Sequence, residues 1–441
     1  MAYQTESDFP TFANGDVAIN LGAGQRYVLH AETLRRGSKF FAERLTEDQT
    51  PVPAKKGKDV QRIRWRFELV ERPAADDTGP GVLEMLELND KGHTVPHSRR
   101  CPPDVENGKM PNPIYDHYRR VLGALYAFTF DVAADDITEV LRDVLGLIEV
   151  GEYIGCVPMI ARTIDLALVS QGVTLYRSIS GNPVAWLSLS MRVQSEIVFR
   201  EGVIHIVGKW NALSDQEKAS LPAAAHEVCE RKHTILDQAK AQIEHDIVKH
   251  YPPELERCAD DGTRAYNRQN YGNDILNWLA VTLFKHWYAA ALVGDKNRHA
   301  KDGGFWLYKV IAEGGDAYLT NVDQGAFHKR FPMSVKGGQV FAHHLSCMKE
   351  GVKQYVEPLL VNHSQLDVKA EGVKYLTCTE VNKHDLPWYV RDTTPFGGQP
   401  SNNGGFDEGI QGMQYYEEEY DNEDLYDDEP EPMPKRIKHT H

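Results

Sequence analysis

Apolar residues change their spacing about a quarter of the way along this 441-residue chain, and the change decides which folds are open to it. Before residue 90, apolar and polar residues alternate in short runs, as in half-buried strands. After residue 113, apolar residues recur every three or four positions, as in amphipathic helices. This order predicts a small sheet packed with helices first, and a mainly helical region after it.

The early elements are predicted from alternation and turn residues. Residues 16–21 and 26–30 alternate like strands and are joined by Gly22-Ala-Gly24, which predicts a hairpin. The pattern then becomes helical over residues 31–45. Residues 62–70 place four large apolar side chains on one face of a third strand, and residues 82–88 suggest a fourth.

The later elements are predicted from helical stripes and start signals. Helices are expected over residues 137–148, 159–169, 182–193, 220–250, 275–293, 303–311 and 338–360. Asp136 with Glu139, and Ser214 with Glu217, have the spacing of a capping box. Asp274 is predicted to cap the apolar helix that follows it.

Composition divides the chain further. Residues 89–113 are rich in Gly, Pro, His and Arg, which is typical of a surface insertion. The predicted segments are a disordered N-terminus (1–13), an α+β domain (14–172) with insertions at 46–61 and 71–113, a helical domain (180–391), and a disordered acidic tail (392–441).

Charge is unevenly distributed along the chain. The formal net charge is −15, and the last 50 residues carry −10 of it. Between Asp392 and Pro434 there are 13 carboxylates and no Lys or Arg. This balance excludes a generally basic nucleic-acid binder, although a local basic site stays open. We expect no direct nucleic-acid contact.

The sequence shows no targeting or membrane signal. The first ten residues lack the basic start and apolar core of a secretory signal. No run reaches the ~18 apolar residues that a membrane span needs. Six widely spaced cysteines form no CxxC pair, so reduced thiols are expected. Together these features predict an intracellular protein, nuclear or cytoplasmic.

Catalytic motifs are missing. Gly22-Ala-Gly24 follows a strand but lacks the third glycine of a dinucleotide loop, and no phosphate-loop lysine motif occurs. The sequence therefore predicts a non-enzymatic protein without a cofactor. The alternative is a zinc enzyme, for which the weak metal candidates are Cys229 with His233, and His343 with His344 and Cys347. Their helical spacing places each group on one face, but ordinary helix residues account for them more simply.

The tail combines aromatic residues with carboxylates over residues 415–431. Such a segment is either a solubilising tail or a docking segment that inserts aromatics into a groove with a basic rim. Lys435, Arg436 and Lys438 follow it and match a short nuclear-import pattern.

The first block of the chain resembles the start of a BTB/POZ domain. The residues that carry this resemblance are Asp16, Val17, His30, Leu34, Ser38, Phe40 and Phe41. Their offsets and the switch from strand to helix agree with that family, and residues 115–131, 137–153 and 159–170 resemble the later BTB helices. The long insertions are similar to those of fungal BTB proteins.

The BTB resemblance implies protein–protein interaction. In that family the first strand and first helix form the dimer face. The corresponding residues here are Asp16, Val17, Ile19, Leu29, His30, Leu34 and Phe41. The resemblance further implies self-association and, in many members, recruitment of substrates to a cullin-type ubiquitin ligase, with unknown partners for the helical region and the tail. The alternative is a nuclear, transcription-associated regulator that lacks a DNA-reading domain.

Overall fold

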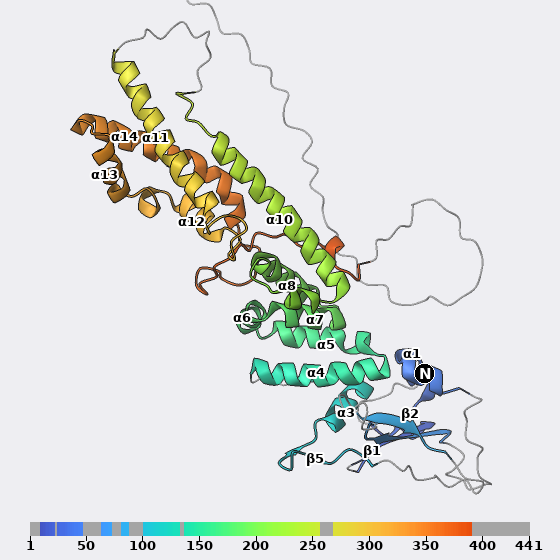
Figure 1. Cartoon of the computed structure of the whole chain (residues 1–441). Helices are drawn as coiled ribbons and strands as arrows, with labels where there is room; N and C mark the ends of the chain where they lie inside the picture. Colours follow the sequence, from blue (N-terminus) through green and yellow to red (C-terminus); the bar gives the residue numbers. More distant parts are fainter. Residues whose placement is uncertain are drawn as a thin grey trace, which may run out of the picture. The chain divides into compact units, whose positions relative to one another are not determined.

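The computed structural model describes residues 9–22, 24–46, 63–72, 81–87, 100–132, 136–255 and 268–389. Its coarse architecture agrees with the sequence: a small N-terminal sheet packed with helices is followed by a mainly helical region (Figure 1). The described residues belong to one compact unit. No helix within those ranges is long and apolar enough to cross a membrane.

The N-terminal sheet has four strands in the order β2-β1-β3-β4. These are β1 (Val17–Gly22), β2 (Gln25–Leu29), β3 (Trp65–Val70) and β4 (Val82–Met85). β1 runs parallel to β3, and the two outer pairs are antiparallel. The alternation predicted from the sequence is present, because the side chains of Trp65, Phe67 and Leu69 are all buried.

Two short helices, α1 (Ala31–Gly37) and α2 (Lys39–Arg44), connect β2 with the third strand. The backbone N–H of Ala31 at the start of α1 donates to the carboxylate of Asp16 at 2.7 Å. Ser38 caps α2, since its hydroxyl accepts from Phe41 N at 3.2 Å. Local polar residues therefore fix where both helices begin.

The predicted insertion before residue 113 holds a small exposed hairpin, β5 (Val105–Glu106) with β6 (Met110–Pro111). The helices then follow one another along the chain. They are α3 (Ile114–Ala124), α4 (Ile137–Ile154), α5 (Val157–Val169), α6 (Val173–Gly181), α7 (Pro183–Val193), α8 (Glu196–Lys209), α9 (Asp215–Ala219) and α10 (Ala223–Lys249).

The C-terminal part of the described chain is helical as well. It contains α11 (Arg268–Val293), α12 (Phe305–Glu313), the short turn η4 (Gly315–Ala317), α13 (Asn321–Arg330) and α14 (Val335–Val356). Two short 3₁₀ turns, η5 (Glu357–Leu360) and η6 (Lys383–Asp385), follow. The segment 361–389 that contains η6 returns to α8 and α10. Its Ser364 hydroxyl donates to Glu201 of α8, and its Asp385 pairs with Arg231 and Lys232 of α10 at 2.9 and 2.7 Å.

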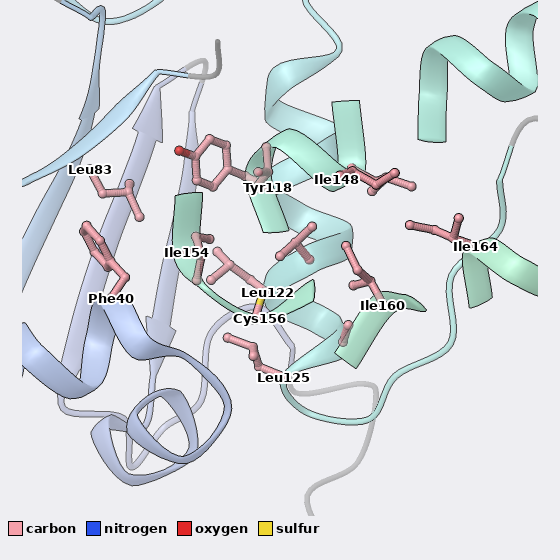
Figure 2. Close-up of a cluster of buried hydrophobic side chains, with 14 of the residues drawn as sticks. Phe40, Leu83, Tyr118, Leu122, Leu125, Ile148, Ile154, Cys156, Ile160 and Ile164 are labelled. Carbon is pink, nitrogen blue, oxygen red and sulfur yellow. The ribbon is translucent and has the colours of Figure 1, made fainter. Parts of the chain in front are cut away.

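Two apolar cores lie within the described residues. The first joins the sheet to α3, α4 and α5; Figure 2 shows Phe40 and Leu83 facing Tyr118, Leu122 and Ile154 across it. The second joins α10, α11, α12 and α14. α7 and α8 contribute to both cores: Trp186 and Val198 lie in the first, and their neighbours Leu187 and Phe199 lie in the second. Because these helices belong to both cores, the two halves form one unit. The boundary predicted between residues 172 and 180 therefore does not separate two independent cores.

Several local predictions were wrong. Asp136 makes no side-chain cap on α4, so only the Ser214–Glu217 capping box is confirmed. Asp274 does not cap α11, which begins six residues earlier. Phe12 lies in the segment predicted to be disordered, yet it is 3 % exposed and packs on the sheet. Burial of the Phe12 ring removes apolar surface from water, and this gain orders a segment that its composition predicted to be disordered.

Candidate functional site

Helices α11, α12, α13 and α14 build a compact layer around buried aromatic rings. Phe284 and Trp287 of α11 pack on Tyr318, and the Trp287 and Tyr318 rings stack with centroids 4.2 Å apart. Phe327 of α13 stacks on Phe341 of α14 at 5.3 Å. These contacts fix the short helix α13, which has no fully buried residue of its own, against the longer helices.

A buried lysine of α14 binds the turn between α12 and α13. Lys349 of α14 is 4 % exposed, and its ammonium donates to the backbone carbonyls of Gly315, Tyr318 and Leu319 at 2.7, 2.7 and 3.1 Å. Burial lowers the pKa of Lys349 below its ordinary value. Lys349 thereby supplies a donor to three carbonyls in the turn between α12 and α13, of which that of Leu319 also accepts from Gln324 Nε2 at 3.2 Å.

The turn from α13 into α14 presents a surface of a different kind, which we call the α13–α14 corner. It consists of His328, Lys329, Arg330, Phe331, Val335 and Lys336, all of which are exposed. Phe331 is 51 % and Val335 is 83 % exposed. Phe331 still packs against Phe327, with ring centroids 5.0 Å apart, so the corner is attached to the aromatic layer.

The corner is positively charged in a chain whose net charge is negative. From Gln324 to Lys349 the sequence contains four Lys or Arg residues and no Asp or Glu. Basic residues at the end of α13 are expected, because a helix C-terminus favours cations. That effect does not explain the adjacent exposed apolar residues Phe331 and Val335. Apolar side chains surrounded by charge of one sign are typical of an interaction surface.

A family model of the fungal FF domain matches residues 252–358. The matched region begins just after α10 and contains α11, α12, α13 and α14. Neither the curated proteins nor the solved structures gave a match. The chain is therefore similar to an FF domain over less than half of its length, and the corner lies inside the matched region.

The comparison overturns the BTB/POZ assignment of residues 14–172, for which no family match was found. The pattern that suggested it has local causes in this structure. Asp16 receives the N–H at the start of α1, and Ser38 caps α2. Leu34 and Phe41 are buried where the helices cover the sheet. Any small sheet covered by two short helices needs apolar and capping residues at such offsets, so the offsets do not identify a family.

The residues predicted for a BTB dimer face lie mostly in the chain's own core. Val17, Ile19, Leu29, Leu34 and Phe41 are each 0 % exposed. His30 is partly buried, and its backbone N–H donates to the Tyr126 hydroxyl at 2.7 Å. The dimer face and the cullin-ligase role depended on the BTB resemblance and are withdrawn with it.

The candidate zinc ligands are not brought together. Cys229 is fully buried in α10, and burial raises the pKa of its thiol to about 12. His233 stacks on Trp210 with ring centroids 5.4 Å apart. His343 and Cys347 contact each other on α14, with Nε2 and Sγ 3.7 Å apart. Within the described ranges, no group of three or more His, Cys, Asp or Glu side chains is placed to hold a metal.

The remaining predicted features lie outside the described residues. These are the acidic tail, its aromatic segment 415–431, and the import residues Lys435, Arg436 and Lys438. The corner itself was missed from the sequence because α13 was not predicted. Two signals were available: Thr320 and Asp323 form a capping box at the start of α13, and acidic residues stop at Asp323 for 26 positions.

Proposed function

We propose that this chain is a nuclear, non-enzymatic protein that binds other proteins, and that its FF-matched region supplies a binding surface. The family match supports this proposal, since FF domains are helical and typically occur in proteins associated with transcription and splicing. The proposal agrees with the nuclear regulator that the sequence suggested as an alternative, and it needs no DNA-reading domain.

The partner segment is defined by the chemistry of the α13–α14 corner. Lys329, Arg330 and Lys336 favour an acidic segment, and their exposure makes the attraction sensitive to salt. Phe331 and Val335 favour an apolar side chain within that segment. Burying a half-exposed Phe contributes about 1 kcal/mol, so the expected complex is weak and transient.

The proposal rests on the α13–α14 corner because its basic and apolar residues occur together on helices that aromatic contacts hold in place. Phe327 connects Phe331 to Phe341 in the core through two ring contacts. A preorganised surface loses little conformational entropy when a partner binds. The corner therefore needs no rearrangement before it meets an acidic peptide.

The test uses the full chain and a synthetic peptide of Asp and Glu residues with a central Phe. We expect fluorescence anisotropy to show binding that weakens at least tenfold when Lys329, Arg330 and Lys336 are all changed to Glu. The matched control reverses Lys296, Lys301 and Lys309, which lie in the same region outside the corner. Equal losses in both variants would show a general charge effect and remove the corner from the proposal.

The nuclear part of the proposal is tested separately. A tagged full chain is compared with a variant in which Lys435, Arg436 and Lys438 are changed to Ala. We expect the unaltered chain to concentrate in the nucleus and the variant to lose that enrichment. An unaltered chain that is excluded from the nucleus contradicts this part, whatever the peptide measurement shows.

A further inference from the structure

A second candidate site lies away from the FF-matched region. A cavity of about 480 Å³ is formed by α6, α8 and the segment 361–389. On α8 its lining residues are Ile197, Arg200, Glu201 and Ile204, whose spacing places them on one face of the helix. The volume falls within the range of small-ligand pockets.

The segment 361–389, which forms part of the cavity wall, is tied to α6 and α8 by hydrogen bonds. Arg177 of α6 binds Glu371 through two hydrogen bonds of 2.8 and 2.6 Å. The hydroxyl of Ser364 and the backbone N–H of Gln365 both donate to the Glu201 carboxylate, the latter at 3.0 Å. The cavity is therefore formed in the chain before any ligand binds.

Glu201 gives the cavity a negative charge. Burial by itself would raise the pKa of this carboxyl, but hydrogen bonds from His205, Ser364 and Gln365 outweigh burial and lower it. The carboxylate is consequently ionised at neutral pH. Glu201 is itself a lining residue, and Tyr176 lies in the same lining; burial, followed by the charges of Glu201 and Asp165, raises the pKa of Tyr176.

Arg200 does not cancel this charge, because its guanidinium is paired with Glu196 at 2.6 Å. Glu380 adds a further carboxylate at the lining, with His363 Nε2 3.9 Å from it. The cavity therefore keeps an excess of negative charge in a partly desolvated place. Such a place favours a cation that the protein itself does not supply.

Two of the lining residues carry a buried polar atom that has no hydrogen-bond partner among the described residues. One is the hydroxyl of Thr379, whose residue is 6 % exposed, and the other is Nε of Arg200. Buried polar groups are normally paired, so an unpaired donor and an unpaired hydroxyl on residues that line one cavity point to a ligand that supplies partners.

We propose that this cavity binds an arginine side chain presented by a partner peptide. The guanidinium offers several donors, which suits the Thr379 hydroxyl oxygen and the charge of Glu201 together. The aliphatic stem matches the apolar walls made by Ile197, Ile204 and Val381. A carbonyl of the peptide backbone supplies the acceptor that Arg200 Nε lacks.

The experiment titrates the full chain with N-acetyl-arginine methylamide, followed by NMR. The matched probe is the citrulline derivative, which keeps the shape but carries no charge. We expect the arginine probe to bind with millimolar affinity and at least tenfold more tightly than citrulline. Equal binding of the two probes, or no binding of the arginine probe, overturns the proposal.

Variants locate the site. Ile197→Trp fills the cavity and is tolerated because Ile197 is 38 % exposed; it should abolish binding of the arginine probe. Thr379→Val keeps the shape and should weaken binding severalfold. The matched control, Ile235→Trp at a 54 % exposed position of α10, should leave binding unchanged. Undiminished binding by Ile197→Trp overturns the proposal and leaves the function proposed for the corner unaffected.

Discussion

The N-terminal region (residues 9–170) and the FF-matched region (252–358) bury charged side chains in opposite ways. In the first, Arg120 of α3 forms two hydrogen bonds with Asp143 of α4, and His117 Nε2 lies 3.0 Å from the same carboxylate. In the second, Lys349 binds three carbonyls. A buried ion pair fails when one member is lost, whereas a cation on neutral acceptors leaves no opposite charge behind.

This difference predicts different costs of mutation. Asp143→Asn takes from the Arg120 cation its buried carboxylate partner, since the Asp143 and Arg120 side chains are only 13 % and 9 % exposed. The partner that remains, Asp116 at 2.8 Å, is 47 % exposed and therefore compensates only in part. We expect a loss of about 3–5 kcal/mol in the free energy of unfolding, measured with denaturant. The control Glu139→Gln, at a 60 % exposed position on the same helix, should cost less than about 0.5 kcal/mol. A loss below about 1 kcal/mol for Asp143→Asn would remove the contrast.

Lys349→Met should be less costly. The variant removes the Lys349 donor from the carbonyls of Gly315 and Tyr318 and from that of Leu319, which keeps its bond from Gln324. It also removes the cost of burying an ammonium group. We expect a loss of about 1–3 kcal/mol by the same measurement. A loss larger than that of Asp143→Asn would reverse the comparison between the two regions.

The pH dependence sharpens this second prediction. Burial places the pKa of Lys349 below the ordinary 10.5 in the folded chain. Between the folded-state pKa and 10.5 the unfolded chain binds more protons, so Lys349 makes the folded state more stable as the pH rises. The stability difference between the unaltered chain and Lys349→Met should therefore grow toward pH 10.5. A difference that shrinks over this window contradicts the assignment.

The smallest expected effect on stability is at the α13–α14 corner. Val335 is 83 % exposed, so Val335→Ser should change the free energy of unfolding by less than about 0.5 kcal/mol. The same variant should weaken binding of the acidic Phe peptide, because it removes an apolar contact from the corner. Unchanged peptide affinity would restrict binding to the charges, and a large loss of stability would show that Val335 is structural.

Much of the local fold could be predicted from the sequence. The strands of the sheet and the helical stripes of α4 and α5 follow from periodicity, which burial on one face imposes. The helix that the BTB resemblance implied over residues 115–131 ends at Ala124. The prediction failed for α6, α8 and α13. In α8, residues 198 and 199 point to different cores, so no single stripe forms. α13 has no buried residue and is held through Phe327.

The candidate sites were less predictable. The basic part of the corner is present in the sequence as an acid-free stretch, although it was not recognised without α13. The cavity at Glu201 could not be found, because Glu201 and Thr379 are 178 positions apart and meet through the return of segment 361–389. The BTB resemblance shows a different kind of error. The spacing of residues that cap helices or pack in the core was interpreted as the signature of a family.

By itself, the sequence determined where strands and helices form and where charge accumulates, because periodicity, caps and composition act over neighbouring residues. Tertiary structure decided which buried charges are paired, which apolar residues stay exposed at the corner, and which polar groups face the cavity at Glu201. These outcomes depend on contacts between residues far apart in the chain. No local pattern encodes such contacts, so only the packed structure assigns them.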